Sequence, residues 1–240
     1  MSKPTNQKKN LATFFVTSTN SDFVILKEND SKHAIKVLRL KNDDLVDIID
    51  GFGTLIRGII VDDHPKKTKV KILKKERNKK PFLLGLAFCP TKNNDRNDWI
   101  IEKATEIGVT DFYPIYSQNS ERRKFNKDRM KKITISAIKQ SGNLWLPKIH
   151  PFMNFNTFLE NQHNYKNKLM AHCRDKPKSE LKKMTNNNNS QIIIIGPEGD
   201  FTYEEISSAE KYGFKMISLG LNRLRTETAC IAAISIMKLG

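Results

Sequence analysis

QIIIIGPEGD, at residues 191–200, is the stretch that decides the fold of this 240-residue chain. Its four consecutive isoleucines are typical of a strand that is covered on both faces, as in a parallel sheet. Gly196 and Gly199 let the backbone turn sharply and approach a ligand, while Pro197 fixes its own φ. The stretch therefore predicts a buried strand whose loop lies at the carboxyl edge of a parallel sheet, where α/β proteins bind ligands. On spacing alone, an ordinary strand-to-helix turn explains the loop slightly better.

The same arrangement recurs near the end of the chain. Residues 214–219 predict a strand, and residues 226–238 predict a helix that is apolar nearly all round and so buried on most sides. Glu227 suits the positive end of that helix, whereas the cation Arg225 does not. An anionic substrate would compensate Arg225, and an ion pair with Glu198 or Glu227 is the alternative that the residues leave open.

Outward from these two loops, strands alternate with helices. Thr202 and Glu205 have the spacing of a capping box, which predicts a helix after them, and Gly108 is a natural stop for an earlier helix. The alternation predicts an α/β domain with a mainly parallel sheet over residues 81–240. Its other strands are expected at residues 82–88, 111–116 and 167–173, and its other helices at residues 95–107 and 129–140.

The first 75 residues have a different pattern, with short strand-like segments and one helix. Ser31 is expected to cap that helix, and DGFG at residues 50–53 is a strong turn signal. Residues 1–75 therefore predict a small β-barrel domain, and the basic residues 74–81 predict a linker. The strands are expected at residues 14–16, 23–26, 45–49, 55–61 and 69–73.

The charge balance favours a polyanionic partner. Lys and Arg number 42 against 26 Asp and Glu, a formal net charge of +16, and such an excess favours nucleic acid through phosphate neutralisation. Basic residues are in excess both before and after residue 80, so no single tail explains the charge. A lysine-rich solvated surface is the alternative explanation.

Other features of the composition exclude several classes of protein. The polar residues 1–10 do not form a signal peptide and are expected to be loose, as is the asparagine-rich loop at residues 186–189. No apolar run approaches the roughly 20 residues that cross a bilayer, so no membrane contact is expected. The three cysteines lack a CxxC pair, which predicts reduced thiols in a cytoplasmic protein and no metal site. They are Cys89, Cys173 and Cys230.

Several motifs in order resemble one protein family. GPEGDF at residues 196–201, followed by LGLNRLRTETA at residues 219–229, resembles the signature of the SPOUT superfamily. Within it, the pattern is similar to the RsmE family, which methylates N3 of a uridine in small-subunit (16S) ribosomal RNA. The resemblance extends over almost the whole chain. It includes residues 99–109, 139–142 and 146–149, and residues 33–40 and 50–53 resemble the PUA-like RNA-binding domain of that family.

The resemblance implies a fold and a cofactor. The C-terminal domain is expected to be a SPOUT-type α/β domain with a deep trefoil knot, preceded by a PUA-like β-barrel. The absence of GxGxxG after an early strand fits, because the S-adenosyl-L-methionine (SAM) site of this superfamily is not of the Rossmann type. Three loops are implied to hold SAM, through Met170, Ala171, His172, Gly196, Pro197, Glu198, Gly199, Leu219, Gly220, Leu224, Thr226, Thr228 and Ala229.

The resemblance also suggests catalytic roles. Uracil N3 must lose its proton before it attacks, and the ring oxygens then gain negative charge that a cation can stabilise. We assign this task, or contact with the adjacent phosphate, to Arg225. Glu198 and Glu227 are the candidate bases, with His172 behind them. No base is needed if Arg225 lowers the pKa of N3 far enough.

The implied partner is the 16S rRNA of the assembled 30S subunit, with the enzyme acting as a homodimer. Two alternatives stay open at this point, a catalytically inactive rRNA-binding assembly factor and a related knotted methyltransferase acting on another RNA. The candidate phosphate contacts are all cationic or titratable, and each taken singly is also explained as a solvated surface charge. They are Lys32, His33, Arg39, Arg122 and Arg123.

The chain departs from the family pattern at a few positions. Asp200 stands where glycine is usual, and the pair 222–223 (Asn-Arg) replaces a more common Arg-Ile. Asn143 and Thr13 stand where arginine is common. These departures put individual RNA contacts in doubt, but not the reaction.

Overall fold

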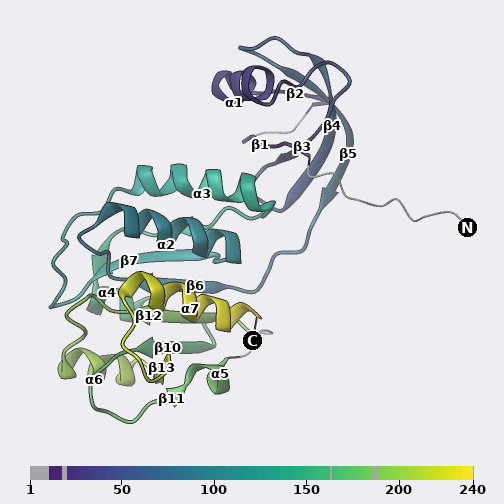
Figure 1. Cartoon of the computed structure of the whole chain (residues 1–240). Coiled ribbons are helices and arrows are strands. Elements are labelled where there is room, and N and C mark those ends of the chain that lie inside the picture. Colours follow the sequence, from purple (N-terminus) through teal and green to yellow (C-terminus); the bar gives the residue numbers. More distant parts are fainter. Residues whose placement is uncertain (1–10, 18–20, 163, 186–188, 240) are drawn as a thin grey trace, which may run out of the picture. The chain divides into compact units, whose positions relative to one another are not determined.

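The structure is a computed structural model that describes residues 11–17, 21–162, 164–185 and 189–239. The predicted loose segment 1–10 and most of the predicted loop 186–189 lie outside these residues. The chain divides into two compact units, residues 1–79 and residues 80–240, which are described separately (Figure 1).

The N-terminal unit is built on one five-stranded sheet. Its strands occur where the short apolar segments predict them, and β1 pairs parallel with β3 while the other neighbours are antiparallel. Side chains that alternate along the strands, among them Phe14, Ile48 and Ile56, form its core. In sheet order the strands are β1 (Thr13–Phe15), β3 (Leu45–Ile49), β4 (Thr54–Asp62), β5 (Lys69–Arg77) and β2 (Phe23–Ile25).

The predicted cap at Ser31 is wrong. Helix α1 (Glu28–Lys32) begins after Lys27 and continues into the π-helical segment η1 (His33–Val37). Ser31 is fully buried inside this helical segment. Its Oγ donates to the carbonyl of Leu26 at 3.1 Å and accepts from the amide of Thr68 at 3.0 Å. The hydroxyl therefore ties the helix to the sheet instead of starting it.

The predicted linker at residues 74–81 is wrong in its first half. Lys74, Lys75 and Arg77 belong to β5, where they pair with Arg57, Ile56 and Thr54 of β4. A run of basic residues indicates only that the segment is exposed to solvent. An exposed β-strand meets that requirement as well as a linker does.

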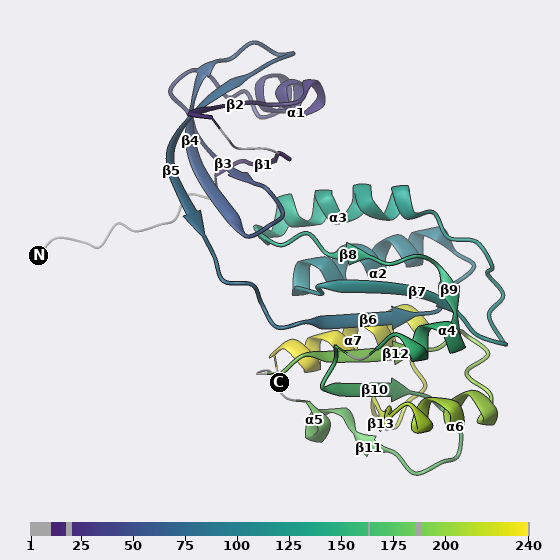
Figure 2. The same cartoon turned by 180° about the vertical axis from the view of Figure 1, so that it is seen from behind.

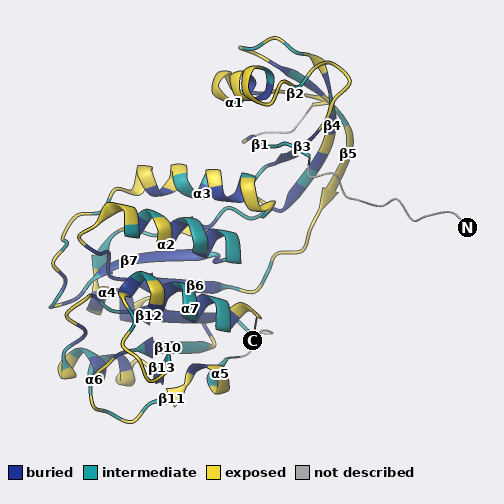
Figure 3. Cartoon of the chain, in the orientation of Figure 1, coloured by how far each residue is buried: buried dark blue, intermediate teal, exposed yellow. Residues whose placement is uncertain are grey.

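The C-terminal unit contains a sheet in which every described strand pair is parallel. This confirms the predicted parallel α/β class, and Figure 3 shows the central strands buried. The predicted trefoil knot concerns the path of the C-terminal chain and stays a prediction. In sheet order the strands are β11 (Ser179–Glu180), β13 (Lys215–Ser218), β10 (Asn167–Ala171), β12 (Gln191–Ile195), β6 (Leu84–Phe88), β7 (Asp111–Tyr116) and β8 (Lys148–Ile149), with β9 (Met153–Asn154) also paired to β7.

Helices cover both faces of this sheet, because alternate residues of the strands point into two separate cores. Leu86 and Ile193 face one core, whereas Ala87 and Ile194 face the other. Figures 1 and 2 show the two faces from opposite sides. One face packs against α2 (Asn94–Ile107), α3 (Lys127–Ser141), α5 (Leu181–Met184) and α7 (Thr226–Leu239), and the other against α4 (Phe155–Glu160) and α6 (Tyr203–Lys211).

The predicted helix boundaries have clear local causes. The side chain of Asn93 caps α2 by accepting from the amide of Asp95, and Gly108 ends the helix at a φ of 109°. Thr202 and Glu205 form both bonds of the predicted capping box at the start of α6. The loop after β12 is therefore held at each end by regular structure.

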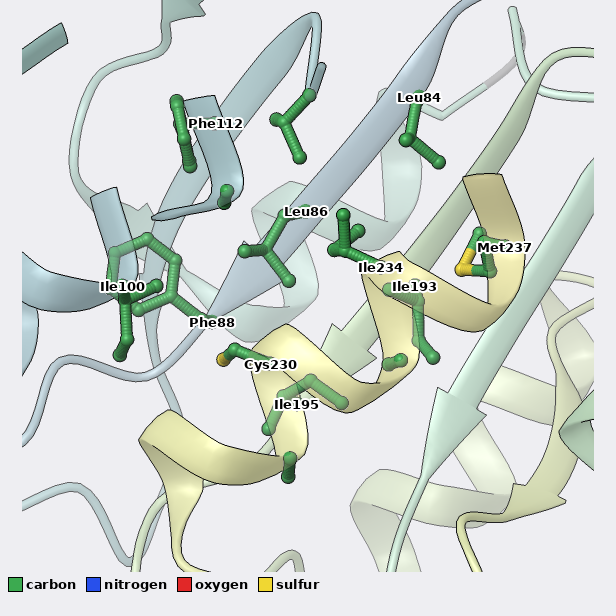
Figure 4. Packing of buried hydrophobic residues seen from close by; sticks show 14 of the residues in the cluster. Leu84, Leu86, Phe88, Ile100, Phe112, Ile193, Ile195, Cys230, Ile234 and Met237 are labelled. Atoms are coloured by element: carbon green, nitrogen blue, oxygen red, sulfur yellow. The ribbon is translucent and has the colours of Figure 1, made fainter. Parts of the chain in front are cut away.

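The last helix is buried on one side only, so the prediction of burial on most sides is half right. Cys230, Ile234 and Met237 pack against β6 and β12, as Figure 4 shows. Thr228 and Leu239 are exposed, and the residues between them on that side are partly exposed. Within the described residues, no helix of this chain is long and apolar enough to cross a membrane.

Candidate functional site: a pocket at three loop ends

A cavity of about 620 Å³ lies at the carboxyl ends of β10, β12 and β13. Its size falls within the range of about 300–1,000 Å³ that is usual for small-molecule sites. The three loops that follow these strands supply almost the whole wall, and α2 adds Arg96. The loop position predicted from the isoleucine strand is thus the position of a ligand-sized cavity.

Two hydrogen bonds join the loops that the sequence singled out. Arg223 donates from Nη2 to the carbonyl of Glu198 at 2.8 Å, and Thr226 donates from Oγ1 to the carbonyl of Gly196 at 3.2 Å. Gly196 also lies against Phe201, since a Cβ at residue 196 would come within 2.7 Å of that ring. The loop after β12 is therefore pre-shaped before any ligand arrives.

Asp200, which replaces the usual glycine, has a structural role. Its φ of 60° lies in the left-handed region that glycine favours and that Asp tolerates better than most residues. Its carboxylate accepts from the amide of Cys173 at 2.9 Å, and its carbonyl accepts from Asn119 at 2.9 Å. The substitution thereby links the loops after β10 and β12. Asn143 is likewise structural, because its side chain donates to the carbonyl of Thr105.

Arg225 is the exposed cation that the sequence left unexplained. It lines the cavity, and within the described part of the chain its side chain has no hydrogen bond or ion pair. The alternative of a pairing with Glu198 or Glu227 is not observed. Glu227 instead lies 3.4 Å from Arg96, and it does not line the cavity. This placement disfavours Glu227 as a base and leaves Glu198 as the candidate carboxylate.

His172 is buried in the cavity wall with 7% of its surface exposed. Neither ring nitrogen has a hydrogen-bond partner among the described residues. Burial, and then the positive charge of Lys178, lower the pKa of His172. The ring is therefore neutral at pH 7, with its hydrogen-bonding groups free for a ligand.

A pH dependence of folding follows from this lowered pKa. As pH falls below about 6.5, the unfolded chain takes up a proton at His172 that the folded chain does not, so the folded state loses stability. We expect His172→Gln to reduce the loss of unfolding free energy between pH 7.5 and pH 6.0. Urea titrations of the ligand-free protein measure that loss, and equal losses in the two proteins would refute the assignment.

The other predicted cofactor residues divide into two groups. Met170 has its side chain in the core, Gly199 lies against Asn119, and Thr228 is exposed on α7, so none of these three lines the cavity. Their contact with a cofactor stays a prediction. The group that does line it comprises Ala171, His172, Gly196, Pro197, Glu198, Leu219, Gly220, Leu224, Thr226 and Ala229.

Some cavity residues could not be predicted from the sequence. Arg96, Lys178 and Arg223 all line the wall. Arg96 stands more than 70 residues before the first of the loops in sequence, and no local pattern indicates that it reaches the cavity. In the sequence, residues 222–223 are notable only because they depart from the family pattern. In the structure, Arg223 bridges two loops.

Arg122 has a structural role, which disfavours its predicted contact with RNA. Its guanidinium donates to the carbonyls of Thr91, Lys92 and Lys124 and to the side chain of Asn94. An arginine has five N–H groups, so these four bonds leave little for a phosphate. Arg122 therefore fastens the loop before α3 to the start of α2.

The remaining RNA candidates stay exposed. Arg123 stacks over the ring of Tyr116 at 4.9 Å and keeps most of its donors free. In the N-terminal unit, Lys32 and His33 follow one another on the helical segment, and Arg39 comes after it with a φ of 57°. Lys32 forms an exposed ion pair with Glu28, which costs little to break.

Comparison with known proteins first defines the class of protein to which this chain belongs. Residues 78–238 match the model of the RNA methyltransferase domain, and residues 26–73 match that of the RNA methyltransferase PUA domain. The chain is therefore built as an RNA methyltransferase with a PUA domain, which confirms the predicted class and fold.

The relatives then define the family. The chain belongs to the family of ribosomal RNA small subunit methyltransferase E. It is 35% identical over 228 residues to the family member from Mesomycoplasma hyopneumoniae, covering 91% of this chain and 95% of that one. It is 32% identical to the member from Buchnera aphidicola subsp. Acyrthosiphon pisum, covering 91% and 88%.

Solved structures agree with this membership. A probable rRNA methyltransferase from Porphyromonas gingivalis has a TM-score of 0.87 at 31% identity, covering 95% of this chain and 98% of that one. Ribosomal RNA small subunit methyltransferase E from Neisseria gonorrhoeae, solved with bound S-adenosyl methionine, has a TM-score of 0.85 at 27% identity, covering 95% and 96%.

Proposed function

We propose that this chain transfers a methyl group from SAM to N3 of a specific uridine in 16S rRNA of the small ribosomal subunit. The observation that carries the proposal is Arg225, which has no side-chain partner among the described residues and lies at the wall of a ligand-sized cavity. The family members are named for methylation of that RNA. The cavity also fits SAM chemically, since buried His172 offers two ring nitrogens without a partner among the described residues.

Different residues of the cavity have different roles in the reaction. SAM supplies an activated methyl group on its sulfonium, so the protein has mainly to orient the reactants and manage charge. Arg225 stabilises the negative charge that develops on the uracil oxygens once N3 is deprotonated. Glu198, the carboxylate of the loop after β12, takes the N3 proton. The loop is held for this by Arg223, which donates to the Glu198 carbonyl.

The substrate is a base that must leave its stack to enter the cavity, as single-stranded or flipped presentation allows. The net charge of +16 favours the RNA backbone. We place the reaction on the assembled 30S subunit, in the cytoplasm where ribosomes are built. Lys32, His33, Arg39 and Arg123 are the proposed phosphate contacts.

The outer side of α7 supports a homodimer. Ile231 and Ala232 are partly exposed between exposed Thr228 and Leu239, and Leu221 on the preceding loop is fully exposed. Ile231, Ala232 and Leu239 thus leave apolar surface on this side of α7, as expected of a subunit contact. Light scattering after gel filtration should give twice the chain mass. A monomer at micromolar concentration would contradict the dimer.

Two single substitutions, compared with each other, test how the loop before α3 contributes to RNA binding. Arg122→Ala should lower the free energy of unfolding by about 2 kcal/mol, because four bonds of a charged group are lost. Arg123→Ala should cost only about 0.5 kcal/mol, the value of an exposed cation–π contact. It should weaken binding of a 16S rRNA fragment and lower the salt slope by about one. If Arg123→Ala leaves that slope unchanged, Arg123 does not contact phosphate.

Transfer of radiolabelled methyl groups from SAM tests the substrate. The expected result is label in 30S subunits that lack the modification, and none in free 16S rRNA or 50S subunits. Equal label in free 16S rRNA would overturn the choice of the assembled particle. SAM binding without transfer to any RNA would favour an inactive assembly factor.

A further inference from the structure

Three cations lie on the loop between β10 and β11, and two of them have carboxylate partners. Arg174 Nε lies 3.9 Å from Asp200 Oδ2, and Lys176 Nζ lies 3.1 Å from Glu210 Oε2. Lys178 is different. Its Nζ donates to the backbone carbonyl of Arg174 at 2.7 Å and lies 3.5 Å from that of His172. Among the described residues, no carboxylate lies within ion-pair distance of Lys178.

Lys178 is also the member of the three that lines the cavity. The carbonyls fix the position of its ammonium without neutralising its charge, and an ammonium has three N–H groups, so at least one stays free. The side chain is half-buried. A cation that is partly removed from water is more stable when an anion accompanies it, so this position favours an anionic group of a ligand.

The other cations of the wall do not offer the same site. Arg96 already has Glu227 as its partner, while Arg223 and Arg225 are exposed on the loop after β13. An exposed guanidinium suits RNA, which approaches from solvent. Lys178 is half-buried and its ammonium lies beside the backbone of the buried His172, so it suits a group carried by the cofactor itself.

We propose that Lys178 binds the carboxylate of the methionyl part of SAM. SAM carries a sulfonium and an α-ammonium, both cationic, so its carboxylate is the group that an ammonium can pair with. The proposal assigns two cations of the wall to different ligands, Lys178 to SAM and Arg225 to the nucleotide. It rests on SAM as the cofactor and not on which RNA atom is methylated.

The neighbouring His172 fits this assignment. Since burial and Lys178 together lower its pKa, the ring adds no second positive charge beside a cofactor that carries two. Its ring nitrogens, which have no hydrogen-bond partner in the described part of the chain, supply neutral hydrogen-bonding groups at the same wall. The wall thus combines one fixed cation for the carboxylate with neutral groups for the remainder of the cofactor.

Calorimetry with two ligands tests the proposal, namely SAM and decarboxylated SAM, which lacks the carboxylate and keeps both cationic groups. The wild-type protein should bind SAM about tenfold to a hundredfold more tightly than decarboxylated SAM, as expected for a hydrogen-bonded charge pair. Lys178→Met should abolish this preference by weakening SAM alone. Lys178→Arg should keep most of it. Lys176→Met, a neighbour that does not line the cavity, should bind both ligands like the wild type.

Several results would overturn the proposal. A wild type that does not distinguish the two ligands would do so, as would a Lys178→Met variant that keeps the preference. Equal weakening of both ligands by Lys178→Met would show a structural role, and thermal unfolding of each variant supports that distinction. Because wild-type SAM binding is measured in the same titration, failure of the cofactor assignment would be seen separately.

Discussion

Arg225→Ala will bind SAM within about threefold of the wild type and will lose turnover by about a hundredfold to a thousandfold, the usual cost of removing one transition-state charge donor. The reason is its position. The guanidinium lines the cavity, is exposed, and has no partner among the described residues. Its loss therefore leaves no buried carboxylate unpaired and does not disturb the loops. Calorimetry and single-turnover methyl transfer measure the two quantities.

Arg225→Lys is the matched control for this prediction. It keeps the charge but lacks the planar fork of a guanidinium, so turnover should recover only in part. Turnover of Arg225→Ala within a few-fold of the wild type would show that Arg225 has no catalytic role. A large loss of SAM affinity in the same variant would move Arg225 to the cofactor side of the cavity.

Gly196→Ala should weaken SAM binding by more than about tenfold and lower the free energy of unfolding by about 1–3 kcal/mol, the usual cost of overpacking. A Cβ at residue 196 would lie 2.7 Å from the ring of Phe201, which is fully buried and cannot retreat without disturbing its core. The loop must therefore shift. The Gly196 carbonyl, which accepts from Thr226, would shift with it. Calorimetry and urea titration measure both effects.

Gly142→Ala is the control for Gly196→Ala, because it strains the backbone of a glycine with a positive φ without adding a close contact. Gly142 has a φ of 71° at the end of α3, and a Cβ there would meet no atom of the described residues within 4 Å beyond its own chain neighbours. The backbone strain should cost about 1 kcal/mol and leave SAM affinity unchanged. If Gly196→Ala behaves like Gly142→Ala in both measurements, the loop after β12 is not the rigid wall described above.

Much of the fold follows from periodic burial, which a sequence displays directly. The isoleucine run of β12 and the capping box of α6 were predicted at the positions where they occur. Two-residue strands such as β8 and β9 were missed, because two residues carry no period. Ser31 was misread for a related reason. A serine near a helix start has the same local pattern whether its hydroxyl caps the helix or bonds to a distant strand.

The cavity was predicted in outline but not in its charges. The loop residues around Gly196 and Leu219 were expected there because the sequence resembles the RsmE family, whereas spacing alone slightly favoured an ordinary turn after the isoleucine strand. Pairing between charged groups depends on which helices and loops meet in three dimensions. For that reason the Arg96–Glu227 pair, the backbone bonds of Arg122 and the carbonyl-held ammonium of Lys178 were found only in the structure.

Nucleoside analysis of 16S rRNA tests the proposed methylation of uridine N3 directly. Unmodified 30S subunits are incubated with the protein and SAM, and their 16S rRNA is digested and mapped by mass spectrometry, with Arg225→Ala as the control. We expect 3-methyluridine at a single position, and a greatly reduced amount with the control. A methyl group on a ribose or on another base, or no methyl group at all, would contradict the proposed reaction.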